Sequence, residues 1–154
     1  MASPEPVEVF EEHIIQKILD LGIIVIAVGG GGIPVIEKEN YLVLGREAVI
    51  DKDRASSLLA VSLKADLFII STDVREVYVD YKKPAQRALG RVTIREMEEL
   101  SKSGQFAKGS MGPKVESAVR FVKKTGKEAI ITSFECLIDA LDGKTGTHVL
   151  PGTV

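Results

Sequence analysis

A run of apolar, mostly β-branched residues that ends in four consecutive glycines constrains this chain most. Residues 23–28 read Ile-Ile-Val-Ile-Ala-Val, and Gly29, Gly30, Gly31 and Gly32 follow directly. A continuous apolar run of this length is typical of a strand covered on both faces. The glycines leave backbone N–H groups open to an anion, because no side chain blocks them. We therefore predict a buried strand and an anion-binding turn; the alternative is a tight turn without a ligand.

Composition excludes several classes of function. The 154 residues suit one domain, residues 1–154, and 45% hydrophobic with 27% charged residues is ordinary for a soluble globular protein. A net charge of −2, dispersed Lys and Arg, and few aromatic residues argue against a nucleic-acid partner. We find no membrane-spanning run and no secretory leader. The single Cys136 rules out an intrachain disulfide, so we expect a cytoplasmic protein.

Two isolated histidines, His13 and His148, are too few and too far apart in the sequence to predict a metal site. Cys136 is most simply explained as an inert, partly buried thiol. We therefore expect no metal ion held by protein ligands alone.

The order of predicted elements indicates an α/β protein. We predict helices at 7–21, from Asp51 or Asp53 to 63, 93–101, 113–124 and 133–141, and strands at 23–28, 67–71, 76–80, 128–132 and 146–150. Residues 37–45 are a loop or a short hairpin. Thr93 opens its helix with a capping-box pattern, Pro113 suits a first helical position, and Ser133 suits an N-cap. Strands separated by helices predict a three-layer α-β-α sandwich with a mainly parallel sheet.

The carboxyl ends of the predicted strands carry the candidate ligand-binding residues. Gly29, the pair Thr72-Asp73 and Ser133 each follow a strand. Ligands in open α/β sheets bind beyond these ends. Thr72, Asp73 and the nearby Tyr78 are a nucleotide shelf in one interpretation and ordinary polar residues at a strand end in the other.

The triplet Asp51-Lys52-Asp53 stands at the start of a predicted helix. In one interpretation Lys52 binds a phosphoryl oxygen and an aspartate fixes the direction of the ammonium groups, since phosphoryl transfer needs positioned positive charge. In the other, the triplet is a helix cap beside a solvated lysine.

Residues 109–114, Gly-Ser-Met-Gly-Pro-Lys, precede and enter another predicted helix. Ser110 and Met111 lie between glycines, and Lys114 falls in the first turn. A cation is unfavourable beside a helix N-terminus unless an anion is bound there. The alternative is a plain loop before a helix.

Taken together, these segments resemble the carbamate kinases of the amino acid kinase superfamily. The resemblance rests on residues 3–6, 27–35, 47–56, 72–84, 109–114, 130–133 and 146–149. Its most specific part is Gly-Gly-Gly-Gly-Ile-Pro-Val at 29–35. It implies an amino acid kinase-like fold and an ATP:carbamate phosphotransferase that forms ATP from carbamoyl phosphate and ADP, with Mg²⁺ accompanying the nucleotide.

The resemblance also implies roles for individual residues. The glycine loop, Gly29 to Gly32, approaches the carbamoyl substrate, Lys52 contacts the transferring group, and Asp53 orients the lysines. Lys114 contacts the nucleotide phosphates. The residues that fall where ATP binds are Thr72, Asp73, Tyr78, Ser110 and Met111. Arg75-Glu76 departs from the family pattern and adds a charge near the expected nucleoside.

The resemblance covers only the C-terminal, nucleotide-binding half of such a kinase. The N-terminal half of the family supplies a further glycine loop, a further catalytic lysine and most of the dimer interface. We therefore expect association of this chain with itself or with a complementary N-terminal half, and weak or no turnover by the chain alone. The alternatives are a non-catalytic nucleotide- or anion-binding module and a purely structural subunit of a two-chain enzyme.

Overall fold

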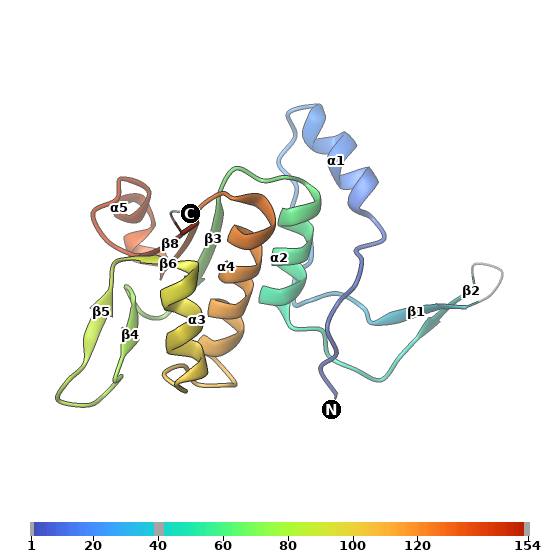
Figure 1. The fold of residues 1–154 in the computed structure, drawn as a ribbon. Coiled ribbons are helices and arrows are strands. Elements are labelled where there is room, and N and C mark those ends of the chain that lie inside the picture. Colours follow the sequence, from blue (N-terminus) through green and yellow to red (C-terminus); the bar gives the residue numbers. More distant parts are fainter. Residues whose placement is uncertain (1, 39–41, 153–154) are drawn as a thin grey trace. The chain divides into compact units, whose positions relative to one another are not determined.

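The computed structural model describes residues 2–38 and 42–152, which form two compact units (Figure 1). The first unit is Met1–Leu63 and the second is Lys64–Val154. Each unit has its own helices and strands and is described by itself below.

The described residues of the first unit form two helices and a pair of antiparallel strands. Its elements are α1 Glu12–Asp20, β1 Val35–Lys38, β2 Leu42–Gly45 and α2 Lys52–Ser62. Strands β1 and β2 pair antiparallel, so the described part of residues 37–45 matches the hairpin alternative; residues 39–41 lie outside the described residues. The predicted helix after Asp51 is confirmed. Asp51 is its N-cap, because the Asp51 carboxylate accepts the backbone N–H groups of Asp53 and Arg54 at 2.9 and 3.0 Å.

Two predictions for the first unit are wrong. Residues 23–28 form no strand, and Ile24 and Ile26 are 93% and 96% exposed. A strand needs a neighbour for its backbone groups, and no described residue pairs with this segment. The first helix begins at Glu12 rather than residue 7, and Val7 is exposed. The apolar side chain of Val7 packs on no other described part of the first unit, so packing does not stabilise a helix at residue 7.

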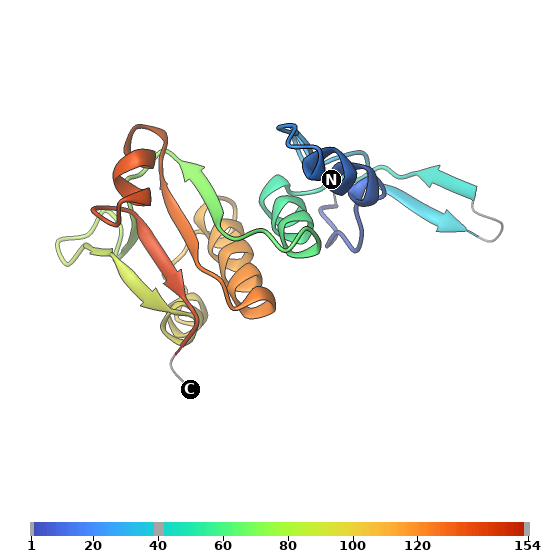
Figure 2. The same ribbon diagram turned by 90° about the horizontal axis from the view of Figure 1, so that it is seen from above.

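The second unit is built on a four-stranded sheet. Its strands are β3 Phe68–Thr72, β6 Arg91–Thr93, β7 Ala129–Ser133 and β8 Thr147–Leu150, in the spatial order β3-β7-β8-β6 (Figure 2). The pairs β3–β7 and β6–β8 are parallel, whereas β7–β8 is antiparallel. The predicted mainly parallel sheet with helices packed on it is confirmed.

Helices and a small hairpin complete this unit. They are β4 Val77–Val79, β5 Arg87–Leu89, α3 Ile94–Lys102, α4 Met111–Thr125, the 3₁₀ turn Phe134–Cys136 and α5 Leu137–Leu141. Helices α3 and α4 pack against each other and against the sheet, and α5 contacts β7 (Figure 1). The core between α4 and the sheet holds the fully buried Phe121, Val122 and Ile131, and the ring of Phe121 lies 5.4 Å from that of Phe68.

Helix starts in the second unit test the predicted caps. The capping box of Thr93 and Glu96 is confirmed. Its bonds from the Thr93 N–H and hydroxyl hold the pKa of Glu96 below the ordinary value. Helix α4 begins at Met111, so Pro113 is its third residue rather than its first; a first turn still tolerates proline, since its N–H groups lack intrahelical partners. Ser133 precedes a 3₁₀ turn without a side-chain cap bond, and α5 starts only at Leu137.

Candidate functional site

The glycine loop of the first unit lies directly against the start of α2. Gly31 is buried with φ +129°, and a Cβ built on it would lie 1.9 Å from the carbonyl oxygen of Ile50 and 3.4 Å from the backbone nitrogen of Lys52. Only glycine permits such an approach. The structure therefore brings together the glycine loop and the Asp51-Lys52-Asp53 triplet, which the sequence places twenty residues apart.

The amides of the four glycines are not equivalent. The N–H of Gly29 donates to Ala27 at 2.7 Å, and that of Gly31 donates to Val28 at 2.8 Å. In the part of the chain that the structure describes, the amides of Gly30 and Gly32 donate to no backbone carbonyl. These two N–H groups are the ones that the loop can offer to an anion.

Lys52 is the first residue of α2 and its side chain is exposed. The carboxylate of Asp51 is used as the N-cap, while Asp53 is half-buried in the first turn. A lysine at this end of a helix is unfavourable beside the helix dipole, and a bound anion reverses that effect. The amides of Gly30 and Gly32 and the side chain of Lys52 are thus the groups of the first unit that could bind an anion, beside the carboxylates of Asp51 and Asp53.

In the second unit, Thr72 and Ser133 end the parallel strands β3 and β7 and are partners in the register. Asp73 follows Thr72 and accepts its hydroxyl hydrogen at 3.1 Å. Tyr78 lies in β4, with its ring 6.0 Å from that of Tyr81. The predicted cluster of polar residues at the carboxyl edge of the sheet is therefore observed for Thr72, Asp73 and Ser133.

The start of α4 is directed to the same edge of the sheet. Helix α4 packs on β7, and only residues 126–128 separate its end from the start of that strand, so the helix runs opposite to the strand and begins near the strand's carboxyl end. Ser110 is the N-cap residue but makes no side-chain cap bond, and the first turn contains no acidic residue. Lys114 is half-buried at the fourth position of the helix. Ser110, Met111 and Lys114 therefore share this edge with Thr72 and Asp73.

Arg75 lies in the segment between these groups and β4. Its guanidinium forms a hydrogen bond with Cys136, and this contact raises the pKa of Arg75 above its ordinary value. Cys136 is buried, whereas Arg75 is exposed. The side chain of Arg75, which departs from the family pattern, thus contacts a residue of the 3₁₀ turn.

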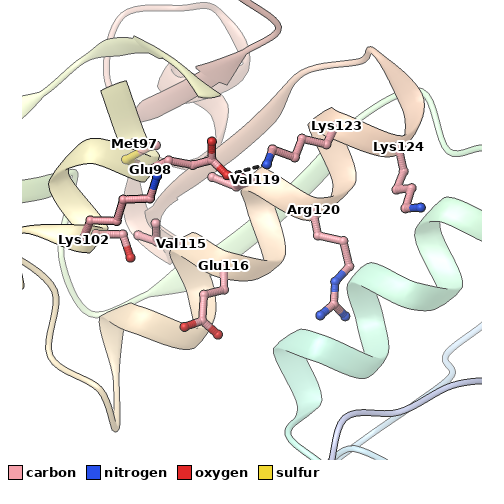
Figure 3. Close-up of a pocket in the computed structure, with 10 residues that line it drawn as sticks. Met97, Glu98, Lys102, Val115, Glu116, Val119, Arg120, Lys123 and Lys124 are labelled. Atoms are coloured by element: carbon pink, nitrogen blue, oxygen red, sulfur yellow. Dashed lines mark hydrogen bonds and ion pairs between the residues drawn. The ribbon is translucent and has the colours of Figure 1, made fainter. Parts of the chain in front are cut away.

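A groove of about 360 Å³ lies between α3 and α4 (Figure 3). Met97, Val115 and Val119 supply its apolar lining, and an ion pair between Glu98 and Lys123 crosses it. None of the predicted site residues lines this groove. It forms no part of the candidate site.

The described residues contain no group of three His, Cys, Asp or Glu side chains placed to hold a metal ion. None of the helices found between residues 2 and 152 has the length and apolar character needed to cross a membrane.

Comparison with known proteins matches this chain to one family. Residues 2–133 match the model of the amino acid kinase family. The chain is 55% identical over 149 residues to a carbamate kinase of Thermoplasma volcanium and 51% identical over 148 residues to carbamate kinase 3 of Staphylococcus aureus. The matches cover 97% and 96% of this chain, and the chain spans about half the length of these relatives, 48% of each.

Solved structures agree with the sequence matches. The structure of carbamate kinase from Giardia lamblia bound to AMP-PNP is similar to this chain with a TM-score of 0.95 and 46% identity. The similarity covers 97% of this chain and 52% of that one. The arrangement of helices and strands described above is that of the amino acid kinase fold.

Proposed function

Because this chain belongs to the amino acid kinase family, we propose that it is the nucleotide-binding half of a carbamate kinase-like phosphotransferase. The reaction is reversible phosphoryl transfer between ATP and carbamate. In the ATP-forming direction, an oxygen of the ADP β-phosphate attacks the phosphorus of carbamoyl phosphate. The bond from phosphorus to the carbamoyl oxygen breaks, and carbamate leaves. The observation that carries the proposal is the close approach of the glycine loop to the N-terminus of α2 beside Lys52.

In this proposal the first unit holds the group in transfer. The amides of Gly30 and Gly32 donate hydrogen bonds to the oxygens of carbamoyl phosphate, and Lys52 places its ammonium group on the phosphoryl oxygens. Asp53 orients the lysine. Preorganised N–H and ammonium groups of this kind stabilise the charge that develops in phosphoryl transfer.

The second unit holds the nucleotide. Thr72, Asp73 and Tyr78 contact the nucleoside side of ADP or ATP, with Ser110 and Met111 at the start of α4. Lys114 binds the phosphates at the N-terminus of α4, where the N-cap residue Ser110 makes no side-chain cap bond. The similar Giardia lamblia structure was solved with AMP-PNP, which supports a nucleotide here.

Magnesium enters with the nucleotide in this proposal. The described residues offer no three-ligand cluster, and Mg²⁺ in such sites keeps waters and takes oxygens from the substrate phosphates with one or two carboxylates. Asp73 is a carboxylate at the sheet edge where those phosphates would lie. The metal neutralises phosphate charge when it is bound.

A second candidate function is a nucleotide-binding module without transferase chemistry. It is favoured by the nucleotide-binding residues of the second unit, because Lys114 and the start of α4 could bind a nucleotide without a carbamoyl substrate. Separate calorimetric titrations with ADP and with carbamoyl phosphate distinguish the two. We expect both ligands to bind, and we expect Lys52→Ala to reduce only the binding of carbamoyl phosphate. Binding of ADP without any binding of carbamoyl phosphate establishes the module instead.

We also propose that the first unit associates with another polypeptide, either a second copy or a complementary N-terminal half. Its described apolar side chains are extensively exposed, among them Val7, Ile14, Leu21, Ile24, Ile26 and Ile33. Residues 23–28 form no strand and have no strand neighbour among the described residues. Such a surface is a template for strand pairing and apolar contact.

Light scattering tests this association. At tens of micromolar we expect a mass of at least a dimer for the chain on its own, because water-exposed apolar area on this scale favours burial. Charged substitutions at Ile24 and Ile26 are expected to return the mass toward that of a monomer. A strictly monomeric, folded chain at this concentration contradicts the proposed association. We also propose a reducing, cytoplasmic location, which the free thiol of Cys136 supports.

A further inference from the structure

Two buried threonines of the sheet hold the segment that connects Asp73 to Tyr78. Thr132 lies in β7 and Thr147 in β8, and both side chains are 0% exposed. Neither was singled out from the sequence. Both hydroxyls bind backbone atoms of the β4–β5 hairpin or of the turn before it.

The hydroxyl of Thr147 joins both strands of the hairpin to β8. It accepts the N–H of Val77 at 2.8 Å and donates its own hydrogen to the carbonyl of Leu89. Val77 and Leu89 are partners in the register of β4 and β5, so one side chain fixes one end of this two-stranded pair. A two-stranded hairpin alone is marginally stable, and Thr147 supplies its anchor.

The hydroxyl of Thr132 holds the preceding turn. It donates to the carbonyl of Arg75 at 3.1 Å. Thr132 and Thr147 occupy diagonal positions of the β7–β8 pair, because Ile131 is the register partner of Thr147. A Cβ built on Gly146 would lie 3.4 Å from the Cβ of Thr132. Gly146 has φ +86°, and the same Cβ would lie 3.1 Å from the Cβ of Ala140. A glycine is therefore needed for the chain to present Thr147 at this depth.

We infer that Thr147, with Thr132, is a positioning residue for nucleotide binding: the pair fixes Arg75 to Val77 and thereby sets the place of Tyr78 relative to Asp73. This inference rests on the nucleotide role proposed above for Tyr78 and Asp73. The hydroxyls do not contact the ligand. They restrict the conformation of the short segment from Asp73 to Tyr78, and both of these end residues contact the nucleotide in the proposed function.

The test compares Thr147→Val, which keeps the shape of the side chain and removes the hydroxyl, with Thr147→Ser, which keeps the hydroxyl. Hydrogen exchange is measured on peptides from residues 74–80, with peptides from α3 as the internal reference. We expect faster exchange at 74–80 in Thr147→Val and near-original exchange in Thr147→Ser, because only serine can still accept the N–H of Val77.

The affinity for ADP is the second measurement. We expect Thr147→Val to weaken ADP binding about tenfold and Thr147→Ser to restore most of it. Should Thr147→Val fail to fold, Thr132→Val replaces it, because it removes a single hydrogen bond and is expected to weaken ADP binding less.

The outcomes separate this inference from the proposed function. Unchanged exchange at 74–80, or unchanged ADP affinity in a variant whose exchange has risen, overturns the positioning role while the proposed function stands. Failure of the original chain to bind ADP overturns the proposed function, and the inference falls with it. Loss of ADP affinity that serine does not restore also overturns the role of the hydroxyl.

Discussion

Replacing Gly31 by alanine is expected to lower the free energy of unfolding of the first unit by about 3–5 kcal/mol and to abolish binding of carbamoyl phosphate. The added Cβ would lie 1.9 Å from the carbonyl oxygen of Ile50 and 2.8 Å from its carbonyl carbon, and backbone atoms cannot move aside as a flexible side chain does. The residue also has φ +129°, which an L side chain rarely adopts. Urea unfolding followed by circular dichroism measures the first effect, and calorimetry measures the second.

Gly30→Ala is the matched control in the same loop. A Cβ built on Gly30 has no heavy atom within 4 Å, and its φ lies outside the left-handed region. The amide that we assign to the anion is retained in this variant. We expect a change in unfolding free energy within about 1 kcal/mol and retained carbamoyl phosphate binding. Equal losses in the two variants would show that the loop is not seated against α2 as described.

Replacing Lys114 by alanine is expected to weaken ADP binding about 10- to 100-fold, with little change in the free energy of unfolding. Helix α4 begins without an acidic residue in its first turn and without a side-chain cap, so a bound phosphate and Lys114 together complete that end. A charge-assisted bond between ammonium and phosphate accounts for an effect of this size. Calorimetric titration with ADP measures it.

Lys124→Ala provides the control for charge. Lys124 lies on the same helix, ten residues further on, and its side chain is exposed. The substitution Lys124→Ala removes the same charge at the opposite end of α4, so a general electrostatic effect on ADP binding would appear in both variants. We expect the affinity for ADP to change less than twofold in Lys124→Ala. Similar losses in the two variants contradict a specific contact between Lys114 and the phosphates.

Elements with strong local signals were predicted from the sequence. Asp51 and Thr93 cap their helices through side-chain bonds to N–H groups two or three residues away, so the sequence contains all that these starts require. The mainly parallel sheet likewise follows from apolar strands separated by helices, and β3 and β7 pair in parallel. The candidate residues Thr72 and Asp73 could be placed for the same reason.

Features that depend on distant neighbours were not predicted correctly. Residues 23–28 have the composition of a buried strand, yet pairing partners decide whether a strand forms, and no described residue pairs with this segment. Strands β5 and β6 were missed because each has only three residues, one of them an arginine, and only Gly90 separates them. A pattern of period two needs a longer run to be recognised.

The candidate site shows the same division. The run of four glycines pointed to a backbone approach, but nothing in it distinguishes Gly31 from its neighbours. The structure distinguishes the glycines in two ways. Gly31 lies against Ile50, and the amides of Gly29 and Gly31 already donate to backbone carbonyls, whereas those of Gly30 and Gly32 donate to none among the described residues. Thr147 gave no signal at all, because its partners Val77 and Leu89 lie 70 and 58 residues away along the chain.

Phosphoryl transfer itself is the most direct test of the account. The chain is mixed with the separately produced N-terminal half of the Thermoplasma volcanium carbamate kinase, a relative 55% identical over the matched residues, and supplied with ADP, Mg²⁺ and carbamoyl phosphate. We predict ATP formation well above that of either polypeptide alone, and its loss on Lys52→Ala in this chain. A stable mixed complex that binds ADP yet forms no ATP, or ATP formation that Lys52→Ala leaves unchanged, contradicts it.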